Sequence, residues 1–365
     1  MKILVTGGHI TPALAVIDEL KNNHSLFFVG RKYALDTESK PSFEYQVIQK
    51  RKISFYHLQA GRLTRILSFR SFINFIKVPL GFFNAYKIIR ETKPDIILSF
   101  GGYIGFPVSL VGYIMSIPIY IHEQTIHPGI ANRITGRIAA KIFISFPETI
   151  HFFPQKKTII TGNPVRQDVL RIIEKPFQII KKRPILYITG GSLGSHSINS
   201  HIETILPQLL KKYTVIHQTG NVEEYNDYER LKKKVSLLPK DLQENYYIAP
   251  HISEQELGFV LSISDLVISR AGANTVFELI AWKIPAVLIP LPWSSYQEQQ
   301  KHALLFQSAG VAEIFDQRNN SLQLLDLIQT ILGDSQKYKN NFKKLTNLFH
   351  KDAASIIKKT LENSQ

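Results

Sequence analysis

One stretch in the second half of the chain, residues 268–292, combines residue types that bind a phosphorylated ligand. Its sequence, ISRAGANTVFELIAWKIPAVLIPLP, predicts a strand, a tight glycine turn, a helix and a second strand. Backbone N–H groups at the helix start, around Ala273, Asn274 and Thr275, suit an anion such as a diphosphate. Glu278 shares a helix face with Asn274 and Thr275, where it can accept hydrogen bonds from ribose hydroxyls. A solvated glutamate after an ordinary turn is the alternative, and these residues alone do not decide between the two.

Two other glycine turns, Gly7-Gly8 and 190–194, directly follow predicted strands. The second suits a phosphate because glycines let the backbone approach closely and Ser192 adds a hydroxyl donor. Neither turn has the spacing of a dinucleotide-binding loop or the lysine of a Walker loop. No aspartate pair or histidine–carboxylate cluster is present to hold a divalent metal. If a nucleoside diphosphate leaves here, helix N-termini with Arg270 or Arg166 must balance its charge, so we expect no metal and no cofactor.

His9 follows the first glycine turn, at the carboxyl end of a strand, where open α/β sheets bind ligands. An imidazole titrates near neutrality and suits a general base for a hydroxyl nucleophile; a structural turn histidine is the alternative. The segment His122-Glu123-Gln124 ends another strand of the same half, so Glu123 could orient His9, bind a sugar hydroxyl or act as the base itself. Gln299 opens a later helix, where an amide suits sugar hydroxyls, although a polar first turn explains it equally well.

The elements that must position these residues form two similar halves. Strands alternate with helices in each half, which predicts parallel, doubly wound sheets, and 365 residues are too many for one ordinary core. We therefore predict an α/β fold with an N-terminal domain of residues 1–163, a C-terminal domain of residues 164–344, and a final helix, about 345–365, that packs back on the first domain. The expected strands are 2–6, 25–29, 45–48, 96–99, 119–121, 142–145, 158–161, 185–189, 215–218, 246–248, 266–269 and 286–289.

The amino-acid composition limits the classes of partner that this chain could bind. The formal net charge of +15 and the pI near 9.7 predict attraction to a membrane surface, a nucleic acid or a phosphorylated substrate. A nucleic-acid-binding protein would need a continuous groove of Lys and Arg. Here, basic and aromatic residues interleave in one segment only, so we predict no nucleic-acid partner. The absence of cysteine excludes disulfides, thiolate catalysis and cysteine-ligated zinc.

That segment, residues 62–90, has bulky apolar residues interleaved with cations, as in a helix that lies in an anionic membrane interface. A core-facing amphipathic helix with a basic solvent face is the alternative. Residues 96–121 carry no charge, but glycines and prolines interrupt them, so we predict a strand, a turn, a short helix and a strand in place of a spanning helix. The expected membrane residues are Arg65, Phe69, Arg70, Phe72, Phe75 and Lys77.

Taken together, these motifs resemble the MurG family, whose members transfer N-acetylglucosamine onto undecaprenyl-pyrophosphoryl-MurNAc-pentapeptide. The resemblance covers nearly the whole chain, with the motifs in the family's order. The matching segments are TGGHITPALAV, FGGYIGFPVSL, IHEQTIHPGIANR, ITGNPVRQDVL, ITGGSLGSHSIN, IHQTG, SRAGANTVFELIAWKIPAVLIPLP and the stretch from Gln299 to Ala309.

The resemblance implies a GT-B fold, in which two Rossmann-like domains face each other across a cleft, and an inverting, metal-independent transferase. UDP-N-acetylglucosamine would bind the second domain: Glu278 would hold the ribose, Ser192 and the 273–275 turn the diphosphate, Gln299 the sugar, and the Ile252 backbone the uracil. Another glycolipid transferase or a UDP-N-acetylglucosamine epimerase on the same fold is the alternative.

The resemblance places the lipid-linked MurNAc-pentapeptide acceptor on the first domain, with His9 or Glu123 as the base, at the cytoplasmic face of a membrane. Three departures from the family stand out. The first loop is shortened to Thr6-Gly7-Gly8-His9, and Thr125 and His302 replace usual asparagines. The expected acceptor-binding residues are Thr6, Gly7, Gly8, Gly101, Gly102 and Tyr103.

Overall fold

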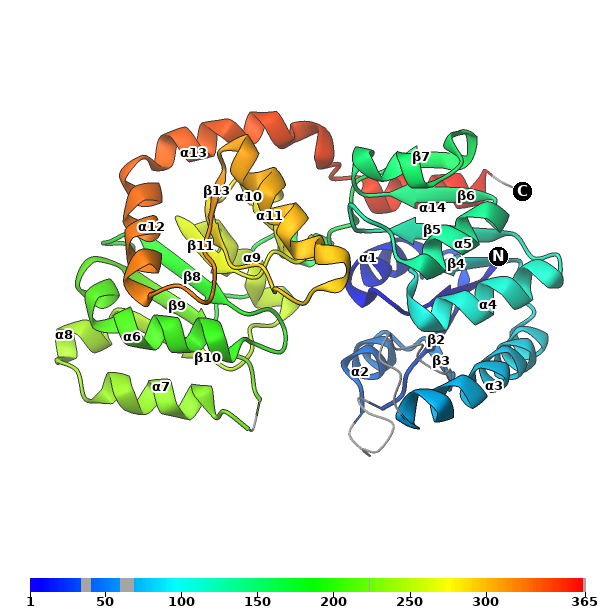
Figure 1. Cartoon of the computed structure of the whole chain (residues 1–365), viewed down its shortest axis with the longest axis horizontal. Helices are drawn as coiled ribbons and strands as arrows, with labels where there is room; N and C mark the ends of the chain where they lie inside the picture. The colour runs from blue at the N-terminus through cyan, green and yellow to red at the C-terminus, as the bar shows by residue number, and fades with distance from the viewer. Residues whose placement is uncertain (34–40, 60–68, 223, 364–365) are drawn as a thin grey trace. The chain divides into compact units, whose positions relative to one another are not determined.

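The computed structural model describes residues 1–33, 41–59, 69–222 and 224–363, with the backbone alone for 69–77. The chain divides into two compact units (Figure 1). The first unit combines Met1–Pro164 with His350–Gln365, and the second is Val165–Phe349. Each unit is built on a parallel sheet, so the predicted α/β fold with two doubly wound, Rossmann-like domains is confirmed.

The sheet of the first unit has the order β3-β2-β1-β4-β5-β6-β7, and its described strands are all parallel. The order reverses between β1 and β4, and ligands of open α/β sheets bind at such a switch point. Thr6 at the end of β1 pairs with Val29 on one side and Ser99 on the other, so three strands end together there. The strands are β1 (Lys2–Thr6), β2 (Ser25–Gly30), β3 (Ser54–His57), β4 (Ile96–Ser99), β5 (Ile119–Glu123), β6 (Lys141–Ile144) and β7 (Thr158–Ile160).

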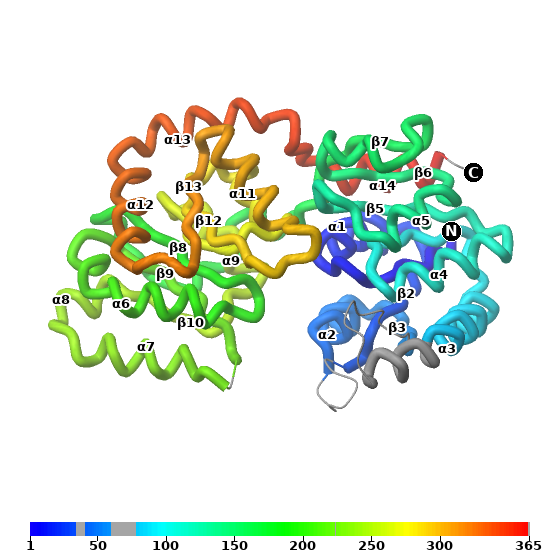
Figure 2. The backbone as a smooth tube through the Cα atoms, in the orientation of Figure 1, coloured from blue at the N-terminus to red at the C-terminus, as the bar shows by residue number. Residues whose placement is uncertain are grey.

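Helices cover both faces of this sheet. One core joins α1, α2 and α14 to the sheet through residues such as Leu14, Ile48 and Ile357, and the other joins α3 and α4 through Ile89 and Val108. The carboxyl-terminal helix α14 lies against α1, which Figure 2 shows in red and blue. The helices are α1 (Ile10–Leu20), α2 (Phe43–Lys50), α3 (Phe69–Thr92), α4 (Gly102–Ile114), α5 (Ile130–Ile138) and α14 (Ala353–Glu362).

The strand predicted at residues 45–48 is wrong, because this segment lies inside α2. Ser42 caps the helix by accepting a hydrogen bond from the Tyr45 N–H, and Val47 and Ile48 bury one helix face. A short apolar run with Tyr, Val and Ile has strand-like composition, and its length alone does not separate the two structures. The strand of this region is β3, which follows α2 and which the sequence pattern did not reveal.

The second unit repeats the arrangement, with the sheet order β10-β9-β8-β11-β12-β13 and a switch point between β8 and β11. Its strands are β8 (Ile185–Thr189), β9 (Thr214–Gln218), β10 (Tyr246–Ala249), β11 (Leu266–Ser269), β12 (Ala286–Leu288) and β13 (Ala312–Ile314). Its helices are α6 (His196–Lys212), α7 (Asp227–Ser236), α8 (Lys240–Gln243), α9 (Glu254–Ile263), α10 (Ala273–Trp282), α11 (Glu298–Ala309), α12 (Ser321–Gly333) and α13 (Ser335–Asn341).

The uncharged segment 96–121 forms β4, α4 and β5, as the interrupted pattern predicted. Its helix, α4, has 13 residues, whereas a spanning helix needs about 20. Within the described residues, no helix has both the length and the apolar character to cross a bilayer.

Candidate functional site

In the N-terminal unit, the glycine turn Gly7-Gly8 after β1 packs directly on the turn Gly101-Gly102 after β4, at the switch point of the sheet. A Cβ atom at Gly102 would lie 3.0 Å from the Gly8 Cα, and one at Gly8 would collide with the Gly101 carbonyl. Gly101 and Gly102 also have φ of 79° and 74°, which favours glycine. Ser99 links the turns, because its Oγ accepts hydrogen bonds from Thr6 Oγ1 at 3.0 Å and from the Gly101 N–H at 3.3 Å. The structure therefore brings most of the predicted acceptor-binding residues together.

His9 stands at the entrance of α1, as its N-terminal flanking residue, and is partly buried. Its Nδ1 lies 2.6 Å from Nε2 of Gln124, which directly follows β5. Burial lowers the pKa of His9, and the nearby Glu123 carboxylate opposes that shift. Burial and the charge of His9 lower the pKa of the neighbouring His122 to about 3, so His122 stays neutral at physiological pH. A neutral, partly buried imidazole at a strand end meets the requirements of a general base.

Glu123 is tied into the fold around it. The side chain is 2% exposed, and its Oε1 accepts hydrogen bonds from the Thr125 N–H at 3.0 Å and the Thr125 hydroxyl at 2.8 Å. Its Oε2 accepts a third bond, 2.9 Å long, from Asn132 Nδ2. Thr125, one of the departures from the family pattern, thus holds the carboxylate. These contacts favour an orienting role for Glu123 over a role as the base.

Two charged residues beside the first glycine turn were not anticipated from the sequence. The Arg31 guanidinium lies 5.8 Å from the ring centroid of Tyr103, an expected acceptor-binding residue. The Glu44 carboxyl on α2 lies over the first turn, and a Cβ atom at Gly7 would collide with it. Glu44 Oε2 accepts a hydrogen bond from the Arg31 N–H at 3.2 Å, whereas Oε1 is buried without a partner among the described residues. Burial raises the pKa of Glu44 to about 7.

In the second unit, Glu278 on α10 forms part of a partly buried charged cluster. Arg166 lies 3.6 Å from Glu278 and 2.6 Å from Glu254 at the start of α9. Burial raises the pKa of Glu278, and Arg166 counteracts this shift. The positive charge of Arg166, which was predicted to balance a diphosphate, is thus shared with two carboxylates of the chain, and one of them is Glu278. Glu254 was missed in the sequence, where only its position after a predicted strand could have drawn attention to it.

The predicted glycine turn leads directly into the start of α10. Gly272 precedes the helix and provides no side-chain cap, and the expected residues Ala273, Asn274 and Thr275 form the first turn. A helix start without a cap suits an anion. His302 on α11 is fully buried, and its Nδ1 lies 3.0 Å from the Ala271 carbonyl, so this departure from the family pattern supports the same turn.

Arg270 holds the neighbouring glycine loop together. Its guanidinium donates hydrogen bonds to Ser195 Oγ at 2.7 Å, Ser197 Oγ at 2.8 Å and Gln317 Oε1 at 2.9 Å, and to the Ile289 carbonyl at 3.0 Å. Ser195 caps α6, so Arg270 fixes the helix start that closes the loop. Burial lowers the pKa of Arg270 to about 10. Ser192, which was predicted to contact the diphosphate, is exposed in this loop.

Gln218 at the end of β9 connects two segments that were predicted to contact the nucleotide, the glycine loop with Ser192 and the backbone at Ile252. Its Nε2 donates to the Gly191 carbonyl at 3.0 Å, and its Oε1 accepts from the Ile252 N–H and the Tyr187 hydroxyl, both at 3.2 Å. The backbone of Ile252 was expected to meet a uracil, and its N–H donates a hydrogen bond within the chain. Gln218 lies in the segment IHQTG, which carried the resemblance but no assigned role.

Gln299 is the second residue of α11 and is tied to the turn that precedes it. Its Oε1 accepts a hydrogen bond from the Leu291 N–H at 3.0 Å, and its N–H donates to Ser294 Oγ at 3.4 Å. Tyr296 and Gln297 between them have φ of 52° and 55°, an unusual conformation for residues with side chains. The amide oxygen of Gln299, a residue that was predicted to contact the sugar, is therefore bound by the loop that precedes α11.

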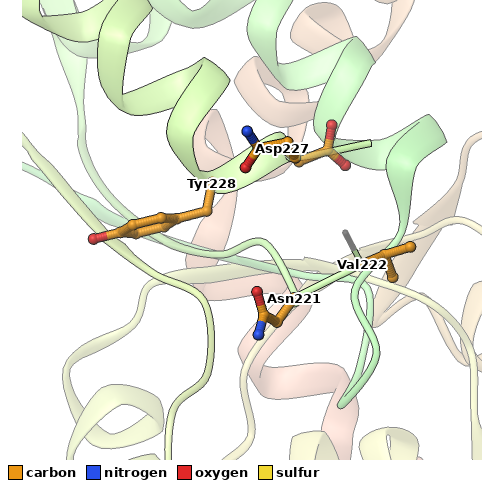
Figure 3. A pocket seen from close by; sticks show the side chains of 6 residues that line it. Asn221, Val222, Asp227 and Tyr228 are labelled. Atoms are coloured by element: carbon orange, nitrogen blue, oxygen red, sulfur yellow. The ribbon is translucent and has the colours of Figure 1, made fainter. Parts of the chain in front are cut away.

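A hollow of about 280 Å³ lies beyond the end of β9, next to the start of α7. Figure 3 shows the side chains of Tyr228 and Asp227 pointing in opposite directions beside it. Asp227 is held by Asn199 at 2.7 Å and His196 at 2.9 Å. None of the predicted site residues lines this hollow, which is bounded by Gly220, Asn221, Val222, Asn226, Asp227 and Tyr228.

The predicted membrane residues cannot all be placed. Arg65 lies outside the described residues, and Phe69, Arg70, Phe72, Phe75 and Lys77 lie on α3, where only the backbone is described. The described part of α3 continues their pattern, with Leu80, Phe83 and Tyr86 exposed by 47%, 53% and 42%. The ammonium of Lys87 lies 4.5 Å from the Phe83 ring centroid, and the guanidinium of Arg90 lies 5.8 Å from that of Tyr86.

No group of three or more His, Cys, Asp or Glu side chains could hold a metal ion within the described ranges. At the two glycine turns of the second unit, the start of α10 has no side-chain cap and Ser192 is exposed.

Comparison with known proteins relates both units to one family. Residues 5–144 match the glycosyltransferase family 28 N-terminal domain, and residues 185–359 match the glycosyltransferase family 28 C-terminal domain. The chain is 35% identical to UDP-N-acetylglucosamine--N-acetylmuramyl-(pentapeptide) pyrophosphoryl-undecaprenol N-acetylglucosamine transferase 2 of Bacillus cereus, over 94% of this chain and 95% of that protein. It is 34% identical to the corresponding transferase of Clostridium kluyveri, over 94% of each chain.

Solved structures share the fold. MurG of Acinetobacter baumannii superposes with a TM-score of 0.72 at 24% identity, covering both chains completely. A UDP-GlcNAc 2-epimerase from Neisseria meningitidis, bound to UDP-GlcNAc, has a TM-score of 0.68 at 18% identity, again with complete coverage of both chains. A transferase and an epimerase thus share this fold, and the fold alone does not distinguish between the two activities.

Proposed function

This chain belongs to glycosyltransferase family 28, and from that membership we propose that it transfers N-acetylglucosamine from UDP-N-acetylglucosamine to the 4-hydroxyl of MurNAc in undecaprenyl-pyrophosphoryl-MurNAc-pentapeptide. The product is the disaccharide lipid of peptidoglycan synthesis. The observation that carries the proposal is the 35% identity with a transferase named for this activity over 94% of the chain.

The second unit binds the sugar nucleotide in this proposal. Glu278 accepts hydrogen bonds from the ribose hydroxyls, and Arg166, 3.6 Å away, orients it and counteracts the effect of burial on its pKa. The uncapped start of α10 and the Ser192 loop receive the diphosphate. Gln299 holds the sugar. The side chain of Gln218 bridges the glycine loop at Gly191 and the backbone at Ile252, and this backbone contacts the uracil.

The first unit binds the acceptor lipid, with the turns at Gly8 and Gly101 near its pyrophosphate. His9 removes the proton from the 4-hydroxyl, and that oxygen forms the new bond to the anomeric carbon from the side opposite UDP. The bond to UDP breaks, and the diphosphate carries away the electron pair with inversion at the sugar. Glu123 supports the imidazolium electrostatically, consistent with its effect on His9.

The test of this function is UDP release from UDP-N-acetylglucosamine, measured with and without the lipid-linked acceptor, in EDTA. We expect release that depends on the acceptor and survives the chelator, because backbone N–H groups and hydroxyls balance the diphosphate charge without a metal. Conversion of the sugar nucleotide without acceptor and without transfer would instead identify an epimerase. Loss of acceptor-dependent release in EDTA would contradict metal independence.

We also infer that the enzyme works as a peripheral protein at the cytoplasmic face of the membrane, docked through α3. The exposed stripe of Leu80, Phe83 and Tyr86, flanked by Lys87 and Arg90, supports this docking. Apolar rings enter the interface while neighbouring cations meet anionic headgroups. The stripe extends the pattern of the predicted membrane residues by two further turns of the same helix.

Replacing Phe83 and Tyr86 together with Ser is expected to weaken binding to anionic vesicles by about 100-fold, because each buried ring contributes about 1.5–3 kcal/mol. Transfer to a short-chain, soluble acceptor should be retained. Vesicle sedimentation and the soluble assay measure the two effects. The matched control replaces the exposed Ile173 and Ile180 of the second unit with Ser. Equal loss in both assays would show that the two rings are needed for folding and not for docking.

A further inference from the structure

Gln124 directs one end of its amide at His9 and leaves the other end without a partner. The contact joins Gln124 Nε2 to His9 Nδ1 at 2.6 Å, while Gln124 Oε1 is buried and has no hydrogen-bond partner in the part of the chain that the structure describes. The side chain is only 6% exposed. The two ends of an amide have nearly the same shape, so their assignment depends on hydrogen bonding.

The two amide orientations give His9 opposite chemistry. If the NH₂ group faces the ring, it donates to Nδ1, and the neutral imidazole then carries its proton on Nε2. That nitrogen has no lone pair to accept a proton from a substrate hydroxyl. If the carbonyl oxygen faces the ring, Nδ1 carries the proton and Nε2 keeps its lone pair. The orientation of Gln124 therefore decides whether Nε2 of His9 can serve as a base.

The geometry favours the oxygen. Hydrogen bonds from N–H to oxygen span about 2.7–3.2 Å and lie at the short end when the donor is charged. The separation of 2.6 Å lies just below this range, and it lies further below the longer separations of N–H···N bonds, so an oxygen fits it better than a second nitrogen. An imidazolium, which forms when the base takes its proton, also donates from both ring nitrogens. An amide oxygen stabilises that state, whereas an NH₂ group opposes it.

We propose that Gln124 is a positioning residue whose carbonyl oxygen accepts a hydrogen bond from His9 Nδ1–H and thereby fixes the ring tautomer in which Nε2 is basic. The inference rests on the proposed role of His9 in the transfer. Two other titratable groups face His9. Glu123 is engaged by Thr125 and Asn132, and His122 is neutral across the range in which an assay is run.

The kinetic test compares Gln124→Met with Gln124→Glu. Methionine fills similar space without accepting the bond, so kcat should fall by about 100-fold with little change in the acceptor KM. Glutamate still accepts the bond, so kcat should recover. Its charge favours the imidazolium, so the acidic limb of the kcat profile should move to higher pH. Gln155→Glu, an exposed substitution in the same unit, is the matched control. Equal losses in both variants, without movement of the limb, would overturn the proposal.

Nitrogen NMR of the ¹⁵N-histidine-labelled protein tests the bond without any reaction. The His9 signals are assigned by their loss in His9→Asn. At a pH above its titration, we expect wild-type His9 to be the Nδ1–H tautomer and the Met variant to shift toward Nε2–H. A wild-type Nε2–H tautomer would overturn the inference even if transfer is observed. A failure of acceptor-dependent transfer would overturn the proposed function whatever the tautomer, so the two failures are distinct.

Discussion

His9→Asn is expected to lower kcat of the proposed transfer by about 10²- to 10⁴-fold, the usual contribution of a general base. Asparagine keeps a polar group of similar reach at the start of α1 but does not accept a proton at neutral pH. The residue lies at the carboxyl end of β1, beside Gln124 and close to the Glu123 carboxylate. Steady-state UDP release at saturating acceptor measures the effect.

UDP affinity separates this effect from damage to the fold. The residues proposed to bind UDP belong to the second unit and His9 to the first, so calorimetric UDP binding should stay unchanged in His9→Asn. His151→Asn, at an exposed position of the first unit, is the matched control and should retain full kcat. A decrease in kcat of less than about tenfold in His9→Asn would move the role of base to another group.

Arg270→Lys is expected to destabilise the second unit by about 2–4 kcal/mol and to weaken UDP binding by about tenfold or more. The guanidinium connects Ser195, Ser197 and Gln317 with the Ile289 carbonyl. A lysine ammonium keeps the charge but cannot reach four acceptors in this planar arrangement. The loop that starts α6 would lose its anchor, and the diphosphate would lose an ordered set of donors.

Urea unfolding without ligand distinguishes this role from the one predicted from the sequence. A residue whose main task is to neutralise the diphosphate would leave the stability of the free protein unchanged when lysine replaces it. A residue that anchors the loop would lower that stability before any ligand is added. Arg171→Lys, at an exposed position of the same unit, controls for the substitution itself.

Much of the fold could be predicted from the sequence because glycine turns follow buried strands at regular intervals. The predicted bounds of β8 (185–189) and β11 (266–269) are the observed ones. The error at 45–48 arose where an apolar run was too short to show its period. The short strands β3 (SFYH) and β13 (AEI) were not predicted because neither contains the continuous aliphatic run by which equally short strands such as β7 and β12 were recognised.

The candidate site was predictable where chemistry depends on residue type and local spacing, as for Glu278 and the first turn of α10. It was not predictable where a role depends on contacts between distant segments. Arg270 reaches Ser195, which is 75 residues away in sequence, and Gln218 reaches Ile252 across 34 residues. No local pattern distinguishes a cation that binds a ligand from one that binds its own loop.

The carboxyl of Glu44 links three positions that are far apart in the sequence. A Cβ atom at Gly30 would lie 2.7 Å from the Glu44 Cδ, and one at Gly7 would collide with the same carboxyl group. A side chain at either glycine would therefore have to push the Glu44 carboxyl out of its place beside the first glycine turn. That movement would also break the hydrogen bond that Glu44 accepts from the Arg31 N–H, so the absence of a side chain at residues 7 and 30 keeps this contact in place.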